Sequence, residues 1–186
     1  MRPRIADRQY RISGHLLFYL TRMWSTNFGT AGKINGISES RDGKVNSEKV
    51  CSPIFSYSLT VEADDLDEMN HVNNLIYLKW CLKAAGAHSS YVGWSSQRYH
   101  ESGFGFVVRA HKIKYKIPAL LGDEIVVKTW VANMEKVSSD RRYQILRESD
   151  GKRLAEAETT WVFVDFKTLE LAKIPEEVRL AFQQSR

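Results

Sequence analysis

The sequence has few of the residues that define disulfide-rich, metal-binding or membrane-spanning proteins. Only two cysteines, Cys51 and Cys81, occur in 186 residues, too few for a disulfide framework or a cysteine-based zinc site. The five histidines are scattered without metal-ligand spacing, so we expect neither a metal nor a cofactor. The longest early apolar run, residues 16–20, is far shorter than the ~20 residues of a membrane span. We therefore expect a cytoplasmic protein in a reducing compartment, with Cys81 as a small core residue.

Most of the chain also lacks an excess of either charge. Residues 1–50 hold nine Lys+Arg and four Asp+Glu, which accounts for the whole formal net charge of +5, and the other 136 residues carry 18 of each kind. Nucleic-acid-binding domains normally present clustered positive charge. We therefore expect no nucleic-acid partner. The hydrophobic share of 43% and the charged share of 26% are typical of a globular domain with a packed core.

The first 50 residues differ in pattern from the rest of the chain. They lack sustained periodicity and become rich in Gly, Ser, Asn and Lys after residue 25. We interpret residues 1–50 as an N-terminal extension that is poorly ordered or targeting-like, and residues 51–186 as one folded domain. Five arginines before residue 23 weakly resemble an organellar transit segment. Organellar import is thus the alternative to a cytoplasmic location, although a plain upstream extension is the favoured interpretation.

The domain itself is expected to be an α+β fold. Apolar residues alternate over residues 54–61, as in a half-buried strand, and residues 73–88 form an apolar run that predicts a helix buried on most sides. Four more strands are predicted at residues 104–117, 124–134, 141–148 and 153–165, and Pro175 opens a short C-terminal helix. Short links favour antiparallel neighbours. We therefore predict a five-stranded antiparallel sheet wrapped around one long central helix.

The most informative segment lies between the first strand and the long helix. It contains the spaced series Asp65, Asp67, His71, Val72, Asn73, Asn74 and Tyr77. This series resembles the signature of hotdog-fold acyl-CoA thioesterases of the 4-hydroxybenzoyl-CoA thioesterase class, and it is similar to a segment of acyl-carrier-protein thioesterases. Further matching segments follow in the same order up to Pro175. The resemblance implies a hotdog fold and an enzyme that hydrolyses an acyl-CoA thioester to a carboxylic acid and CoA.

A carboxylate before a buried helix suits this chemistry. The first backbone N–H groups of a helix lack intrahelical partners, so they can stabilise the oxyanion that forms when a thioester is attacked. Asp67 is the candidate catalytic carboxylate, as a nucleophile that forms a transient anhydride or as a general base toward water. Asp65 and Asp67 could instead be turn and capping residues, and for Asp65 we favour that structural role.

The remaining site candidates follow from the resemblance. His71 either orients the substrate or fixes the turn, and Asn74 lies where the family often places a polar side chain near the thioester. Asn73 and Asn74 are alternatively helix-capping residues. The predicted catalytic set is Asp67, His71 and Asn74, and the predicted substrate-binding set is Val72, Asn73, Tyr77 and Arg109. Met69 stands where plant carrier-protein thioesterases have Asn, which favours the acyl-CoA branch.

The resemblance also implies partners. It implies a homo-oligomer, a dimer or a tetramer, whose sites lie at the subunit interface, with acyl-CoA or acyl carrier protein as the substrate carrier. Lys112, Lys114 and Lys116 project from one face of a predicted strand; such a stripe is usually a solvated face, and the alternative is a surface for CoA phosphates or an acidic carrier protein. A non-catalytic hotdog protein that binds acyl-CoA is the rival from another functional class.

Overall fold

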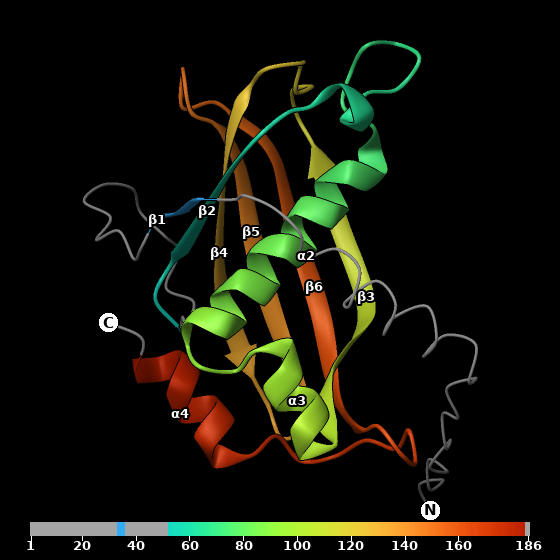
Figure 1. Ribbon diagram of the computed structural model, residues 1–186, viewed down its shortest axis with the longest axis vertical. Helices are drawn as coiled ribbons and strands as arrows, with labels where there is room; N and C mark the ends of the chain where they lie inside the picture. The colour runs from blue at the N-terminus through green and yellow to red at the C-terminus, as the bar shows by residue number, and fades with distance from the viewer. Residues whose placement is uncertain (1–32, 36–51, 185–186) are drawn as a thin grey trace, which may run out of the picture.

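The computed structural model describes residues 33–35 and 52–184, which form one curved sheet packed around a long helix (Figure 1). The strands are β1 (Lys33–Asn35), β2 (Phe55–Thr60), β3 (Phe104–Tyr115), β4 (Glu124–Met134), β5 (Ser138–Arg147) and β6 (Arg153–Asp165). The helices are the short 3-10 helix η1 (Ala63–Asp65), α2 (Asn74–Tyr91), α3 (Ser96–Ser102) and α4 (Glu176–Gln184). None of the helices in these residues is long and apolar enough to cross a membrane.

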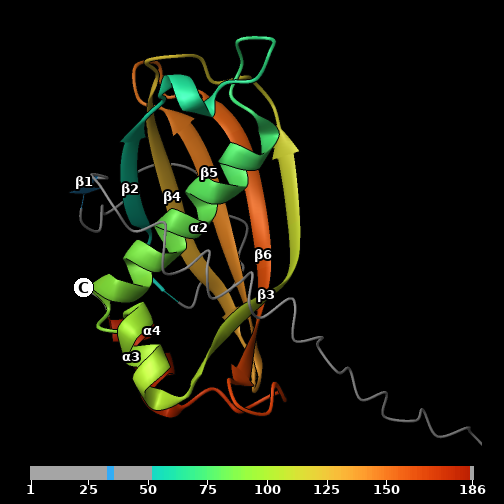
Figure 2. The ribbon, with the colours of Figure 1, turned by 45° about the vertical axis from the view of Figure 1, so that its right-hand side comes forward.

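The sheet is antiparallel in every pairing and follows the order β1-β2-β4-β5-β6-β3. Its middle strands β4, β5 and β6 follow one another along the chain and are joined by short turns, as the Asp-Gly pair at residues 150–151 predicts. The sheet curls around α2, which lies across its inner face (Figures 1 and 2). This arrangement confirms the prediction of an α+β hotdog fold with an antiparallel sheet around one long helix.

The sheet contains one strand more than the sequence predicts. β1 comes from the segment that we interpret as a poorly ordered extension, and its backbone pairs with Ser56, Tyr57 and Ser58 of β2. A three-residue strand is held by backbone hydrogen bonds and needs no apolar alternation, so it leaves no periodic signal in the sequence. Residues 1–32 and 36–51 lie outside the described residues, and the targeting interpretation falls on them.

Helix α2 begins where the capping pattern predicts. The Asn73 side chain accepts a hydrogen bond from the backbone N–H of Leu75 at 2.9 Å, which satisfies one of the amides at the helix start. The helix buries Trp80, Cys81 and Ala84 at exposed fractions of 2%, 0% and 0% against apolar side chains of the sheet. Cys81 is thus the core residue that the sequence predicts, and burial raises the pKa of its thiol to about 12.

A second apolar cluster closes the end of the molecule where α2 terminates. Trp94, Tyr99 and Phe182, from the loop after α2, from α3 and from α4, are buried there with Phe163 of β6. Helix α3 is absent from the sequence prediction because it is only seven residues long. Its capping signals are nevertheless present, since Gly103 follows it with a positive φ of 75°.

The outer face of the sheet carries alternating charges. Lys116 pairs with Glu156 at 2.9 Å, and Arg142 pairs with Glu158 at 3.1 Å. Lys112 and Lys114 lie opposite these two glutamates in the β3 and β6 register. The arrangement favours the solvated-face interpretation of the lysine stripe.

Candidate active site

The loop that carries Asp67 folds back on itself before entering α2. The Asp67 N–H donates to the His71 carbonyl at 2.8 Å, and the Asn70 N–H donates to the Asp67 carbonyl at 3.0 Å. Asn70 adopts a positive φ of 58°, a conformation that asparagine tolerates better than most residues. Leu66 and Val72 form a β-bridge across the base of the loop. These bonds fix Asp67 in the segment that leads directly into the helix.

The two oxygens of the Asp67 carboxylate have different surroundings. Oδ1 accepts hydrogen bonds from the backbone N–H groups of Met69 at 2.9 Å and His71 at 3.2 Å. Oδ2 makes no hydrogen bond or ion pair in the described part of the chain, and the side chain is half-buried. One oxygen therefore holds the turn, as the capping interpretation requires, while the other has no partner among the residues that the structure describes.

The start of α2 adds a backbone donor. The N–H groups of Leu75 and Ile76 are satisfied by the side chain and the carbonyl of Asn73, respectively, both at 2.9 Å. The N–H of Asn74 makes no hydrogen bond among the described residues, and the Asn74 carbonyl accepts from the Tyr115 hydroxyl at 3.0 Å. Asn73 is therefore the helix cap, and the Asn74 amide is the donor available to a carbonyl oxygen.

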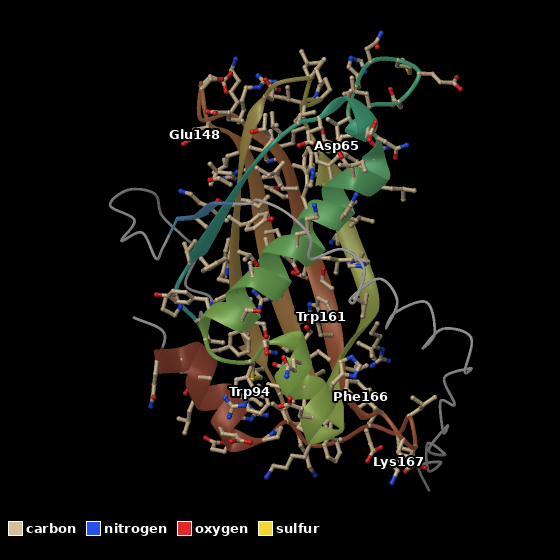
Figure 3. The ribbon with its side chains drawn as sticks, viewed as in Figure 1. Asp65, Trp94, Glu148, Trp161, Phe166 and Lys167 are labelled. Carbon is tan, nitrogen blue, oxygen red and sulfur yellow. The ribbon has the colours of Figure 1, made fainter. Side chains whose placement is uncertain are left out.

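Asp65 has a structural role in this loop. Its Oδ2 accepts from the Glu62 N–H at 3.3 Å, and its carbonyl accepts from the Asn73 N–H at 2.9 Å. These bonds tie η1 to the start of α2. Figure 3 shows Asp65 at this end of the helix. The structural role that the sequence favours for Asp65 agrees with this geometry.

Two of the predicted substrate-binding residues are buried in the single chain. Val72 is 3% exposed and Tyr77 is 2% exposed. The Tyr77 hydroxyl accepts from the Ala119 N–H at 2.8 Å, and the Val72 N–H donates to the Ala119 carbonyl at 3.1 Å. Burial is the main cause that raises the pKa of Tyr77. Both residues thus hold the loop between β3 and β4 against the start of α2.

His71 and Arg109 lie apart from each other. The backbone of His71 closes the Asp67 turn, and its imidazole makes no interaction in the described part of the chain. Arg109 is exposed at an irregularity of β3, between Val108 and Ala110. It precedes Tyr115, which contacts the start of α2, by six residues, about 20 Å of extended strand. Within one chain the structure therefore does not bring Arg109 to Asp67.

The loop of residues 118–123 adjoins the segment that carries Asp67, since the Val72 N–H donates to the Ala119 carbonyl and the Gly122 N–H donates to the Val61 carbonyl. None of its residues is among the predicted site residues. Arg147 donates from Nε to Asp123 at 2.9 Å and from Nη2 to the Pro118 carbonyl at 3.2 Å. This anchoring presents Leu120 and Leu121 to solvent, at 45% and 60% exposed. The Gly122-Asp123 pair was the available sequence signal, since its glycine has a φ of +79°.

The surface around Asp67 is apolar and open. Met69 is 73% exposed and Leu75 is 71% exposed, and Leu120 and Leu121 lie on the adjoining loop. A cavity elsewhere in the domain, lined by residues of α2, α3, α4 and the inner face of the sheet, includes none of the predicted site residues. Among residues 33–35 and 52–184, no group of three or more His, Cys, Asp or Glu side chains is arranged to hold a metal ion.

The antiparallel sheet around a single helix, with a partly free carboxylate in the loop before that helix, defines a hotdog-type domain. A family model for the thioesterase-like superfamily matches residues 61–182. The chain therefore belongs to the thioesterase-like superfamily. The match includes the Asp67 loop, all of α2 and the strands from β3 to β6.

Individual relatives support the same placement. The chain is 29% identical over 128 residues to the long-chain acyl-CoA thioesterase FadM of Escherichia coli K12, covering 68% of this chain and 95% of that protein. It is 32% identical over 98 residues to the chloroplastic palmitoyl-acyl carrier protein thioesterase of Cuphea hookeriana, covering 53% of this chain and 23% of that protein. The chain thus spans about a quarter of the length of the chloroplast relatives it matches.

A solved structure gives the same fold. The structure of a 1,4-dihydroxy-2-naphthoyl-CoA thioesterase from Synechocystis superposes with a TM-score of 0.66 at 23% identity, covering 70% of this chain and 96% of that one. At this level of identity the likeness concerns the fold.

Proposed function

We propose that this chain hydrolyses the thioester bond of an acyl-CoA and releases a carboxylic acid and CoA. Membership of the thioesterase-like superfamily supports the reaction class, and the relative matched over 95% of its length is named a long-chain acyl-CoA thioesterase. The observation that carries the proposal is the difference between the two Asp67 oxygens. Oδ1 accepts hydrogen bonds from two backbone amides, whereas Oδ2 has no hydrogen-bond partner in the described part of the chain.

The geometry suits two routes for the same hydrolysis. In one, Oδ2 of Asp67 attacks the thioester carbonyl, the thiol of CoA leaves, and water hydrolyses the resulting anhydride. In the other, Asp67 takes a proton from water, whose oxygen attacks the carbonyl; the C–S bond then breaks, and CoA leaves as the thiol after taking up that proton. In both routes the carbonyl oxygen gains negative charge, and the N–H of Asn74 at the helix start, which has no partner among the described residues, is the candidate donor to it. In either route, the side chains of His71 and Asn74, at the edge of the same loop, would contact the substrate.

A second copy of the chain completes the proposed site. The apolar side chains Met69, Leu75 and Leu121 stand at 60% to 73% exposed around Asp67, and a subunit seated on them would form the cleft that an acyl group needs. We therefore expect a homo-oligomer, which analytical ultracentrifugation would detect as an integral multiple of the chain mass.

A hydrolysis panel tests the function. Palmitoyl-CoA, a short acyl-CoA, an aromatic acyl-CoA and palmitoyl-acyl carrier protein are compared at matched concentrations by release of free thiol. We expect kcat/KM for at least one acyl-CoA to exceed that for the carrier-protein substrate tenfold or more. The reverse order would favour the second candidate substrate, an acyl carrier protein thioester, which the 32% identity to a chloroplastic carrier-protein thioesterase supports. No turnover of any substrate would overturn the hydrolase proposal and leave the acyl-CoA-binding rival.

A further inference from the structure

A cavity lies toward the end of the molecule opposite the Asp67 loop. It is lined by residues of the last turns of α2, of α3 and α4, and of the inner face of the sheet. Figure 3 shows Trp161, one of its walls, toward the α3 end of the sheet, far along α2 from Asp65. Ser89, another lining residue, follows Asn74 by fifteen positions, which is about 22 Å along the helix.

The cavity combines apolar walls with a single cation. Its volume is about 30 Å³, larger than the about 10–15 Å³ that one water molecule needs. The space is therefore large enough for a group of a few heavy atoms. Its apolar walls include Phe106, Val131, Met134, Trp161 and Phe182, and its cation is Arg141.

Arg141 is buried and has no carboxylate partner among residues 33–35 and 52–184. It is 5% exposed, and its Nη1 donates to His88 Nδ1 at 2.9 Å and approaches Thr129 Oγ1 at 3.3 Å. Its guanidinium also lies 5.5 Å from the ring centre of Phe182. Its other guanidinium N–H groups make no hydrogen bond or ion pair in the described part of the chain. A buried guanidinium with free donors is costly unless an anion joins it.

The neighbours of Arg141 do not supply the missing negative charge. Burial, and then the charge of Arg141, lower the pKa of His88 to about 2, so His88 is neutral and accepts the Arg141 proton donor through Nδ1. The next residue in the strand shows the contrast. Arg142 points to the outer face and is paired with Glu158 at 3.1 Å. The inner-face Arg141 thus combines burial with the lack of an acidic partner among the residues described.

We propose that this cavity is a binding site for a small carboxylate, whose two oxygens pair with the Arg141 guanidinium while its apolar body contacts Val131, Trp161 and Phe182. The planar guanidinium presents parallel N–H groups that match the two oxygens of one carboxylate. A singly charged group balances the single buried cation. A phosphate would bring more charge and more acceptors than the apolar walls can satisfy.

The carboxylate belongs to a free acid in this proposal. Between the cavity and the Asp67 loop, α2 packs tightly on the sheet: Trp80, Cys81 and Ala84 are at most 2% exposed. An acyl group bound at Asp67 does not reach Arg141 through that packing. The site is therefore separate from the proposed hydrolysis site, and its test does not depend on catalysis.

Nuclear magnetic resonance on the wild-type chain tests the site directly. The protein is labelled with ¹⁵N-arginine and titrated with acetate, butyrate and benzoate at constant ionic strength, with chloride and phosphate as comparison anions. We expect the Arg141 Nε–H signal to shift saturably with at least one carboxylate and to stay unchanged with chloride. Unchanged arginine signals up to 50 mM of every carboxylate would overturn the proposal, as would an equal shift with chloride.

A matched pair of variants separates this site from general anion effects. In Arg141→Met the rise in melting temperature that the binding carboxylate causes should disappear, whereas Arg142→Met should keep it. If Arg141→Met does not fold, Arg141→Lys, which keeps the charge but loses the paired donors, should lower the affinity at least tenfold. Equal rises in all variants would refute the site. A KM increase in these variants specific to acyl-CoAs that end in a carboxylate would instead show that the carboxylate arrives on a substrate, and would refute the free-acid proposal.

Discussion

Replacing Asp67 by asparagine separates the two functions of this side chain. The asparagine carbonyl can still accept the hydrogen bonds from the Met69 and His71 N–H groups that Asp67 Oδ1 accepts at 2.9 and 3.2 Å. The other oxygen, which has no partner in the described residues, becomes an uncharged amide group. The variant therefore keeps the turn but loses the base or nucleophile.

The expected effect on catalysis is large. General-base or nucleophilic carboxylates contribute about 10² to 10⁴-fold to a rate, so we expect kcat/KM of Asp67→Asn to fall about a thousandfold. At 1.36 kcal/mol for each factor of ten, this is a loss of about 4 kcal/mol of transition-state stabilisation. Free thiol release from the best acyl-CoA of the hydrolysis panel measures it, and urea unfolding should show a stability close to that of the wild type.

Two neighbouring variants act as controls. Asp65→Asn, in the same loop, should retain most of the activity because Asp65 bonds to the Glu62 N–H and serves the loop structure. Asp67→Ala should lose activity and also about 0.5–2 kcal/mol of stability, because the turn loses its acceptor. An Asp67→Asn enzyme within threefold of wild-type kcat/KM would refute the assignment of Asp67 as the reacting group.

Three further predictions concern the interior. Burial lowers the pKa of His88 to about 2 in the folded state, whereas a histidine in the unfolded chain has a pKa of about 6.5. As the pH falls below about 6.5, the unfolded chain is protonated at His88 and the folded chain is not, so the free energy of unfolding should fall by about 1.4 kcal/mol per pH unit toward pH 2. This slope, measured by urea unfolding from pH 7.5 to 4.5, should be smaller in His88→Phe, and equal slopes would contradict the burial of a neutral imidazole. Tyr77→Phe leaves the buried Ala119 N–H without its acceptor and should cost about 1–3 kcal/mol of unfolding free energy; no loss would show that another group accepts this proton. Gly105→Ala would place its Cβ 2.4 Å from the Phe166 ring and should cost about 1–3 kcal/mol, with recovery in the double variant carrying Phe166→Leu; a failure to recover would locate the strain elsewhere.

Local patterns predicted the elements that carry most of the core. Every second residue of β4 faces the core, namely Ile125, Val127, Thr129 and Val131. This alternation and the apolar run of α2 can both be recognised in the sequence, because each pattern involves only residues that are close together along the chain. The sequence patterns did not predict helix α3 or strand β1. Each is short, and β1 depends on pairing with β2 rather than on its own pattern.

The loop that carries most of the candidate site residues could be predicted because it is continuous in sequence. Asp67, His71 and Asn73 lie in one loop, in which the side chains of Asp67 and Asn73 accept hydrogen bonds from backbone groups two to four positions away. The burial of Tyr77 depends on Ala119, 42 positions later, and no local pattern reports such a contact. The placement of Arg109 near the site came from the resemblance, and within one chain it lies too far along β3.

The short strand β1 has a practical consequence for anyone shortening this protein. A chain cut at residue 51, the start of the domain expected from the sequence, would lose the backbone partner of Ser56, Tyr57 and Ser58. The bared N–H and C=O groups of β2 would then offer a template for strands of other molecules. Truncation upstream of Lys33 would keep this edge of β2 paired. Truncated proteins that retain residues 33–35 should therefore remain monodisperse at concentrations where the shorter form aggregates.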